Sequence, residues 1–346
     1  MQESLSNREK EILKYIVENF IKSASPVASR SISKKTELNL SSATIRNVMS
    51  DLEDMEFLET PHTSAGRMPT DKGYRYYVDS LMHKESLNKS EIKFLRNQLE
   101  DTKNNVVNNQ ELFYETSKLL GKISHQLAIV TEPFLSSGVF EKLELILVSS
   151  TKILVILNIK SGHVRTVIME IDGEISKSKI DLIASYLNEK LQGLTLKEIR
   201  ETFSERVGDI KYKEPELFQL FINSIDKIYY DEEKGGNIFV AGTGDIISQP
   251  EFDDPRSFKN LIELSENKNL VVHIFQNKGK KNNEVTISIG SENIEKKLKD
   301  YSVICTTYSF GDIKGNIGIV GPKRMNYKKM VSLIEYTSNL ITEINL

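Results

Sequence analysis

The sequence predicts an α+β protein, because helix signals and strand signals occupy separate blocks of the chain. Residues 1–84 carry the apolar spacing and capping residues of short helices. Apolar, β-branched runs separated by turn residues fill two later blocks, 140–171 and 284–321, with a charged, helix-like block between them. An antiparallel sheet begun in the first strand block and completed in the second would make residues 175–245 an insertion. A chain of 346 residues has room for about two or three domains.

Capping residues mark the N-terminal helices. Ser6 and Glu9 have the spacing of a capping box, in which the serine hydroxyl accepts from the Glu9 amide and the carboxylate accepts from the Ser6 amide. A second, short helix is expected at about 27–35, and a third after Ser41 or Ser42. Each longer helix has one apolar face, made by Ile12, Leu13, Ile16, Phe20 and Ile21 in the first and by Ile45, Val48, Met49, Leu52 and Met55 in the third.

The second and third helices, joined by a short turn, have the pattern of a helix-turn-helix DNA-binding motif. In that motif the later helix enters the major groove, and its first residues meet base edges. Because the apolar set must face the core, the side chains on the other side should point outward: Ser42, Thr44, Arg46, Asn47 and Ser50. Arginine pairs well with guanine, asparagine with adenine, and a threonine methyl group with that of thymine. We therefore expect Thr44, Arg46 and Asn47 to supply sequence specificity.

Phosphate contacts are expected around the same helix. Ser41 and Ser42 lie at its start, where unpaired backbone N–H groups favour an anion. Arg30 and Lys34 bring positive charge from the second helix. Contacts of this kind set the position of a protein on DNA without reading its sequence.

A β-hairpin wing is expected in the stretch ETPHTSAGRMPT that follows the third helix. Pro61 and Pro69 bracket it, and Gly66 permits a turn with positive φ. Arg67 would then lie at the tip of the wing, where it could reach a phosphate or a minor groove.

Charge is roughly balanced over residues 1–84 but is unevenly distributed. Acidic residues gather late in the third helix and beyond it. The cations lie around the proposed DNA-facing surface: Arg30, Lys34, Lys35, Arg46, Arg67 and Arg75. These patterns leave an alternative open, a small helical interaction domain with an ordinary loop, because helix-turn-helix spacing also arises by chance.

Long segments at both ends of the chain carry a family resemblance. They are LSNREKEILKYIVENFIKSASPVASRSISKK and LSSATIRNVMSDLEDMEFLETPHTSAGRMPTDKGYRYYVD near the N-terminus, with IGSENI and TTYSFGDIKGNIGIVGPKRMNYKKMV later on. These segments closely resemble the heat-inducible transcription repressors of the HrcA family. The resemblance implies a winged helix, then a GAF-like domain with a dimerisation domain inserted into it. With the helix that the apolar spacing predicts as a linker at 85–105, the expected domains are the winged helix at 1–84, the GAF-like domain at 106–175 and 246–346, and the inserted dimerisation domain at 176–245.

The resemblance also implies a function. It suggests a homodimer that represses heat-shock chaperone genes by binding double-stranded DNA at an inverted-repeat operator called CIRCE. A two-fold dimer places two recognition helices on two half-sites, which requires a palindromic operator. The chaperonin GroEL is the expected second partner, since members of the family depend on it to fold into the active form. Repression would fall when misfolded proteins occupy the chaperonin.

No enzyme, metal site or cofactor is expected. The single cysteine, Cys305, lies in an apolar alternating run and has the surroundings of a core residue. The five histidines are scattered and form no metal-binding pair. No nucleophile, base and orienting group can be assembled from the motifs. Lys323 and Arg324, in GPKRMNY, are assigned to a turn before the last helix rather than to an anion site.

A transcription factor that senses a metabolite is the alternative function, because GAF-like domains often hold a small ligand. No stretch of the sequence, however, supplies the converging polar and aromatic groups that such a pocket needs. The N-terminus MQESLSNREK lacks the layout of a signal peptide, and no apolar run approaches the roughly 18 residues that span a bilayer. A cytoplasmic protein without membrane contact is therefore expected.

Overall fold

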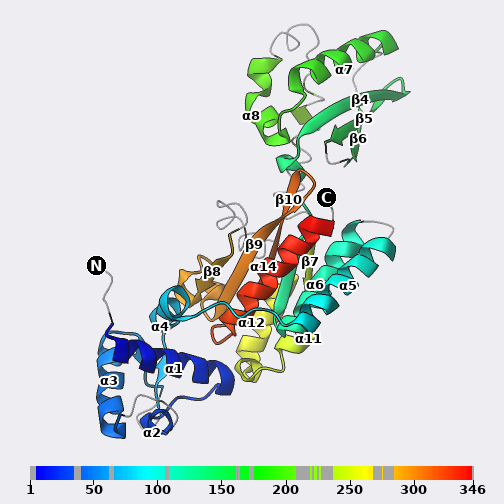
Figure 1. The fold of residues 1–346 in the computed structure, drawn as a ribbon. Coiled ribbons are helices and arrows are strands. Elements are labelled where there is room, and N and C mark those ends of the chain that lie inside the picture. Colours follow the sequence, from blue (N-terminus) through cyan, green and yellow to red (C-terminus); the bar gives the residue numbers. More distant parts are fainter. Residues whose placement is uncertain are drawn as a thin grey trace.

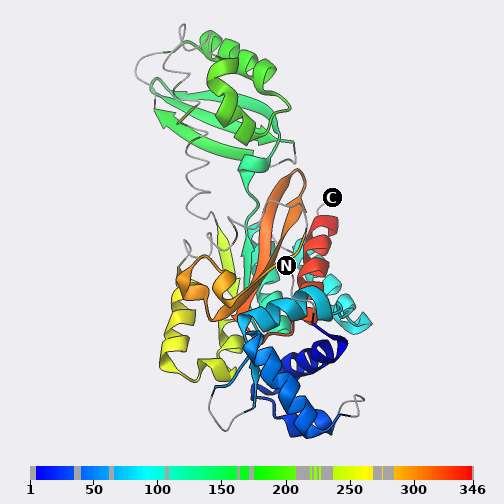
Figure 2. The ribbon, with the colours of Figure 1, turned by 90° about the vertical axis from the view of Figure 1, so that its left-hand side faces the viewer.

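The computed structural model describes residues 5–34, 40–61, 66–105, 109–160, 162, 164–170, 175–207, 219, 222–223, 226, 237–267, 275 and 284–344. The protein is elongated, with an N-terminal helical domain at one end, a body built on a sheet in the middle, and a smaller unit of strands and helices at the other end (Figure 1). The view turned by 90° shows the same order (Figure 2). Helices combined with antiparallel sheets confirm the predicted α+β class.

The N-terminal domain is the predicted helix-turn-helix with a small hairpin. Its elements are α1 (Asn7–Ser23), α2 (Ser29–Ser33), α3 (Ser42–Asp54), β1 (Leu58–Glu59), β2 (Met68–Pro69) and α4 (Asp71–Tyr76), which continues as one π-helical turn (Tyr77–Leu81). The predicted capping box is present, because Glu9 accepts from the Ser6 N–H and the Ser6 hydroxyl accepts from the Glu9 N–H. The apolar faces of α1 and α3 meet in a common core that includes the fully buried Ile12, Ile45 and Leu52.

The body is built on a five-stranded antiparallel sheet in the order β7-β3-β10-β9-β8. Its strands are β3 (Leu127–Thr131), β7 (Ile238–Ala241), β8 (Thr286–Ile289), β9 (Tyr301–Phe310) and β10 (Ile313–Pro322). Its helices are α5 (Lys89–Asn105), α6 (Asn109–Ser124), α11 (Thr243–Ile246), α12 (Pro255–Glu266) and α14 (Tyr327–Ile344), and short 3-10 turns lie at Leu135–Ser137, Pro250–Phe252, Gly290–Glu292 and Lys296–Leu298.

Both faces of this sheet are covered. Ala128 and Val130 of β3 belong to the core shared with α6 and α14, whereas the alternating Leu127 and Ile129 belong to a second core shared with α11 and α12. Because both faces are buried, the strands read as nearly continuous apolar runs instead of alternating ones. Cys305 of β9 lies in the second core and is 3% exposed, which confirms its predicted place in the interior.

The strands of the first predicted block form a separate sheet, in the order β4-β5-β6. These are β4 (Phe140–Ser149), β5 (Lys152–Ile159) and β6 (Val164–Glu170), and α7 (Lys177–Leu191) and α8 (Leu196–Arg206) pack with them. The expectation of one sheet begun in 140–171 and completed in 284–321 is therefore wrong. Short turns pair each of these strands with its neighbour in sequence, and β5 buries only every second side chain, as a sheet covered on one face does.

The insertion consequently begins earlier than the sequence predicted. The chain leaves the main sheet after β3 and returns to it at β7, which pairs directly with β3. The predicted boundary between residues 175 and 176 falls inside the inserted unit, between β6 and α7. The unit is joined to the tip of the β9–β10 hairpin, where the Val139 N–H donates to the Asp312 carboxylate at 2.6 Å.

The helix predicted as a linker belongs to the body. In α5, Arg96 pairs with Glu343 of α14 at 2.9 Å, and Glu91 pairs with Lys329 of α14 at 2.7 Å. Leu95 and Leu99 of α5 are also buried. The extended segment between the π-helical turn and α5, residues 82–88, is what connects the N-terminal domain to the body.

One tyrosine ties three strands of the main sheet together. Tyr308 of β9 lies opposite Gly315 of β10, and a Cβ on that glycine would come within 2.4 Å of the Tyr308 ring. The ring passes over the glycine, and its hydroxyl donates to the Thr131 carbonyl of β3 at 2.6 Å. Glycine at position 315 thus makes room for a hydrogen bond that crosses the middle strand.

We expect Tyr308→Phe to lower the free energy of unfolding by about 1–3 kcal/mol, because the buried Thr131 carbonyl loses a donor. Urea denaturation of the full chain measures the loss. Tyr114→Phe is the matched control, since the Tyr114 side chain is 46% exposed and a change there should cost less than about 0.5 kcal/mol. Equal losses for the two variants would contradict this role of the hydroxyl.

Candidate nucleic-acid interface

The first turn of α3 is held together by its own hydroxyl groups. Ser41 is the N-cap, and its hydroxyl accepts from the Thr44 N–H at 3.1 Å and lies 2.9 Å from the Thr44 hydroxyl. The Ser42 hydroxyl lies 3.2 Å from that of Ser29, the first residue of α2. These contacts fix the angle between the two helices of the motif. Whether Ser41, Ser42 and Thr44 also contact DNA stays a prediction.

Arg46 and Asn47 project from the outer side of α3. Both are exposed, whereas the flanking Ile45 and Val48 are buried in the domain core, which fixes the direction of the helix face. Within the described residues, neither side chain makes a hydrogen bond or an ion pair. A guanidinium and an amide therefore stand side by side on the recognition helix with their hydrogen-bonding groups available to another molecule.

Two of the predicted phosphate-binding cations are also exposed. Arg30 lies in α2, and Lys34 is the C-cap of that helix. Because α2 packs against the start of α3, both belong to the same helix pair as Arg46. Lys35 lies outside the described residues. Binding of phosphates by Arg30 and Lys34 stays a prediction.

The predicted wing is present, and Gly66 has a further role in it. Strands β1 and β2 pair antiparallel, Leu58 opposite Pro69, and residues 62–65 between them lie outside the described residues. The predicted turn with positive φ at Gly66 stays a prediction, because the residue before it lies outside the described residues. A Cβ at position 66 would lie 2.3 Å from the Val27 carbonyl oxygen. Glycine is required because the segment before α2 passes directly over it.

Arg67 does not lie at the tip of the wing, which corrects an expectation. Its backbone exchanges two hydrogen bonds with Val27, at 2.8 and 2.9 Å. Its guanidinium pairs with the Glu53 carboxylate of α3 at 2.8 Å, and the arginine side chain is only 24% exposed. The acidic and basic residues that looked segregated along the sequence thus meet in the fold. Arg67 braces the wing against α3, and a phosphate contact would have to compete with Glu53.

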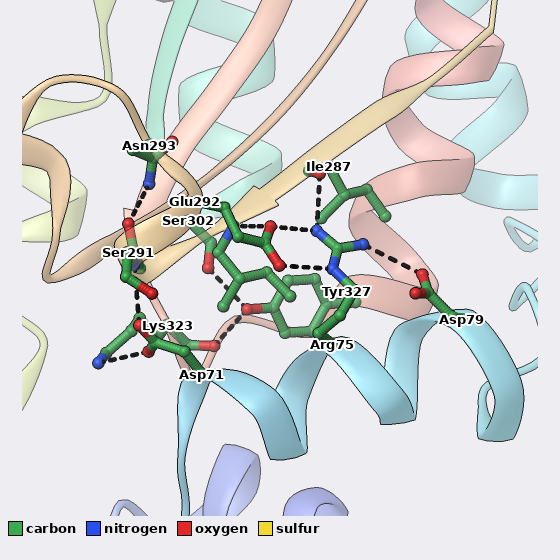
Figure 3. A network of polar contacts seen from close by, with 12 residues as sticks. Asp71, Arg75, Asp79, Ile287, Ser291, Glu292, Asn293, Ser302, Lys323 and Tyr327 are labelled. Carbon is green, nitrogen blue, oxygen red and sulfur yellow. Dashed lines mark hydrogen bonds and ion pairs between the residues drawn. The ribbon is translucent and has the colours of Figure 1, made fainter. Parts of the chain in front are cut away.

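Arg75 faces the body and not the DNA-facing surface, contrary to expectation. Its guanidinium donates to both carboxylate oxygens of Glu292, to the Ile287 carbonyl at 2.8 Å and to Asp79 at 3.1 Å (Figure 3). Glu292 also accepts from the Ile289 N–H at 2.9 Å, which holds it in place. The pKa of Arg75 is raised by the hydrogen bonds to Glu292, so the guanidinium stays charged.

Asp71, one turn earlier on α4, makes the second contact with the body. Its carboxylate accepts from the Lys323 ammonium and from the Ser291 N–H, both at 2.8 Å (Figure 3). Burial raises the pKa of the Asp71 carboxyl, but these two donors outweigh it and hold the pKa below its ordinary value of 3.8. Asp71 and Arg75 therefore dock α4 on the turn after β8 and on the segment before α14.

Further cations of the body complete this joint. Arg324 donates to both carboxylate oxygens of Glu251 and to the Ile21 carbonyl at the end of α1. Lys328 pairs with Glu18 of α1. Lys323 and Arg324 were expected only to form a turn before the last helix, and their role in the joint was not predicted. The only sequence signal for this contact was the presence of two adjacent cations, because their acidic partners lie far away in the sequence.

Comparisons with known proteins agree on one family. The model of the HrcA protein C-terminal domain matches residues 110–331, and the model of the winged helix-turn-helix transcription repressor HrcA DNA-binding domain matches residues 4–81. A heat-inducible transcription repressor HrcA of Chlorobium phaeobacteroides is 40% identical, over 99% of each chain. One of Prosthecochloris aestuarii is also 40% identical, over 98% of this chain and 97% of its own. This chain belongs to the HrcA family of heat-inducible transcription repressors.

Membership confirms the resemblance drawn from the sequence. The chain has the DNA-binding winged helix of HrcA repressors, and a repressor's role is not an enzymatic one. A crystal structure described as that of a hypothetical protein shares the fold, with a TM-score of 0.57 at 23% identity over 98% of both chains. In the part of the chain that the structure describes, no helix is both long and apolar enough to cross a membrane.

The docking of α4 should depend on pH through Asp71. A carboxyl whose pKa is depressed by folding contributes stability above its ordinary pKa and loses that contribution as the pH falls through the depressed value. We expect Asp71→Asn to lower the free energy of unfolding at pH 7 by about 1 kcal/mol, after allowing for solvent screening of this partly exposed pair. The loss should shrink as the pH falls below 3.8.

Urea denaturation at pH 7 and at pH 3 measures this difference. Asp181→Asn is the control, because Asp181 is an exposed carboxyl on α7, away from the joint. A loss for Asp71→Asn that is the same at both pH values, or no larger than that of the control, would show that the carboxylate does not hold the joint.

Proposed function

We propose that the protein is a homodimeric, cytoplasmic repressor of heat-shock chaperone genes that binds the inverted-repeat operator CIRCE. One observation carries the proposal of sequence-specific binding: Arg46 and Asn47 are exposed on the capped helix α3 and have no partner among the described residues, while the neighbouring Arg67 is held by Glu53. Arginine and asparagine are the side chains best suited to guanine and adenine in the major groove. Arg30, Lys34 and the start of α3 would then bind phosphates.

The outer face of the inserted sheet supports the dimer. Across the three strands, Ile146 of β4, Leu154 of β5 and Ile168 of β6 lie side by side in register. Ile146 is 46% and Ile168 61% exposed, and Val148 and Val164 on the same sheet are 57% and 58% exposed. An apolar sheet face of this kind on a single chain is typical of a protein–protein interface. A second copy of the chain, related by a two-fold axis, would cover it.

Modulation by GroEL is the remaining part of the proposal and rests on the family alone. Members are expected to reach the active form with the help of the chaperonin, so the active fraction of a purified sample should rise when GroEL is added. A repressor that senses a small molecule is the second candidate, and a cavity of about 270 Å³ between the N-terminal domain and the body favours it.

A fluorescence-anisotropy titration tests the proposal. The purified chain is titrated against a CIRCE-type inverted repeat and against a scrambled duplex over a range of salt concentrations, with and without GroEL. Preference for the repeat by about 10³-fold, with an active fraction that rises with GroEL, is the expected result. Equal binding to both duplexes would overturn specific repression. An active fraction that does not change with GroEL would exclude modulation by the chaperonin.

We expect Arg46→Ala to lose about 1–3 kcal/mol of binding free energy per half-site on the operator and much less on the scrambled duplex. The reason is that a base contact is lost only where the right base is present. Arg256→Ala is the control, because it removes an exposed arginine of α12 in the body. Equal losses on both duplexes would show that Arg46 contacts a phosphate and not a base.

We expect Ile168→Asp to convert the dimer into monomers, because a charge would be buried without a partner at the interface. Sedimentation velocity measures the mass, and operator binding should fall as the dimer is lost. Leu182→Asp is the control, since Leu182 is 71% exposed on α7, the helix that packs with the inserted sheet. If Ile168→Asp remains a dimer, the interface lies elsewhere.

A further inference from the structure

The charged contacts between α4 and the body fix an angle as well as a distance. Arg75 donates to both carboxylate oxygens of Glu292 and to the Ile287 carbonyl, so the plane of its guanidinium is held (Figure 3). Glu292 is itself held by the Ile289 N–H at 2.9 Å. Paired hydrogen bonds between arginine and a carboxylate are specific in their geometry, whereas apolar packing across the same joint has no direction.

Asp71 makes the second fixed contact, and the backbone of the body is shaped to receive it. The carboxylate accepts from the Ser291 N–H and from the Lys323 ammonium, both at 2.8 Å. Gly290 has a φ of 55°, and a Cβ there would overlap the Asp71 carboxylate, so glycine permits both the turn and the close approach. Asp71 and Arg75 lie four residues apart on one face of α4. Two such contacts prevent the helix from turning about either one.

The other connections between the N-terminal domain and the body define its angle less well. The covalent connection is residues 82–88, which form neither helix nor strand. Lys84 in this segment pairs with Glu335 of α14, but both side chains are largely exposed, and pairs of this kind contribute little. Arg324 and Lys328 also contact α1, each through one hydrogen bond, which limits distance more than angle. The orientation of the domain therefore depends mainly on the two contacts of α4.

This joint lies far from the proposed dimer interface. The N-terminal domain is at one end of the elongated chain and the inserted sheet is at the other (Figures 1 and 2). A two-fold axis at the inserted sheet would place each α3 at the end of a long arm, where a rotation at the joint moves it relative to its copy. DNA requires accurate placement, because one added base pair moves a half-site by about 3.4 Å and turns it by about 35°.

We propose that Asp71 and Arg75 are positioning residues that set the spacing between the two half-sites that this repressor accepts. They hold each reading helix at one angle, so both half-sites are engaged together only when the spacer has the matching length. Two linked binding events strengthen each other only where the geometry lets both occur at once. The inference rests on the proposed function, because it requires a dimer and an inverted repeat.

The experiment measures the fluorescence anisotropy of labelled duplexes with the full chain. The duplexes are CIRCE-type repeats whose spacer is shortened or lengthened by one, two or three base pairs, a single half-site and a scrambled sequence. The unchanged chain should bind the best spacing at least about 10²-fold more tightly than a spacer altered by two base pairs. Arg75→Met should reduce this preference at least tenfold by gaining affinity for the altered spacers. Affinity for the single half-site should be retained, because α3 and its own domain are not altered.

Arg96→Met is the matched control. It removes an arginine that also donates to both oxygens of a carboxylate, Glu343, but within the body, between α5 and α14. This variant should keep the sharp preference for one spacing. Asp71→Asn weakens the other contact of α4 and should broaden the preference in the same direction, so it tests the proposal even if Arg75→Met does not fold. Lower affinity of both α4 variants for every duplex, with the preference between spacers unchanged, would overturn the proposal.

The remaining outcomes separate this inference from the proposed function. If the unchanged chain binds the repeat no better than the scrambled duplex, the repressor proposal is refuted, and the role of the joint in spacing is refuted with it. If the unchanged chain binds the repeat specifically but with equal affinity at every spacing, the repressor proposal remains and the role of Asp71 and Arg75 in spacing is refuted.

Discussion

The position of the DNA-reading helices depends on the docking of α4 against the body. Asp71 and Arg75 lie one turn apart on this short helix and bind Lys323 and Glu292, residues more than 200 positions away in the sequence. Arg324 and Lys328 of the body also contact α1, through the Ile21 carbonyl and the Glu18 carboxylate. The N-terminal domain is thus held by ion pairs and hydrogen bonds as well as by an apolar core that continues from α4 into α14, where the rings of Tyr74 and Tyr327 lie 6.1 Å apart.

The local features of the N-terminal domain were predictable because they depend on residues close together in sequence. The capping box of Ser6 and Glu9 and the cap of α3 by Ser41 follow from spacing alone. The outward direction of Arg46 and Asn47 follows from the apolar residues next to them. Gly66 could not be explained in this way. Glycine is necessary there because the backbone of Val27 lies against it, and only the fold brings these two residues together.

The roles of the cations could not be predicted, for the same physical reason. A lysine or arginine on a helical face gives no sign of whether it faces solvent, DNA or a carboxylate from another domain. Arg67 and Arg75 both have acidic partners, and Arg46 has none among the described residues. Strand pairing posed a similar problem. Apolar runs predicted β4, β5 and β6 correctly, but nothing in them indicates which other strands they join.

The insertion between β3 and β7 has a consequence for how the chain folds. Thr131 and Tyr308, which meet in the sheet, are 177 residues apart, and the inserted unit lies within that interval. Such distant pairings form slowly, because a long loop must close before any contact stabilises it. During synthesis, β3 is complete long before β10, its central neighbour, leaves the ribosome. Until then the four apolar residues of β3, Leu127 to Val130, are not covered by their neighbouring strand, and exposed apolar strands of this kind make a newly made protein prone to aggregate and dependent on chaperones.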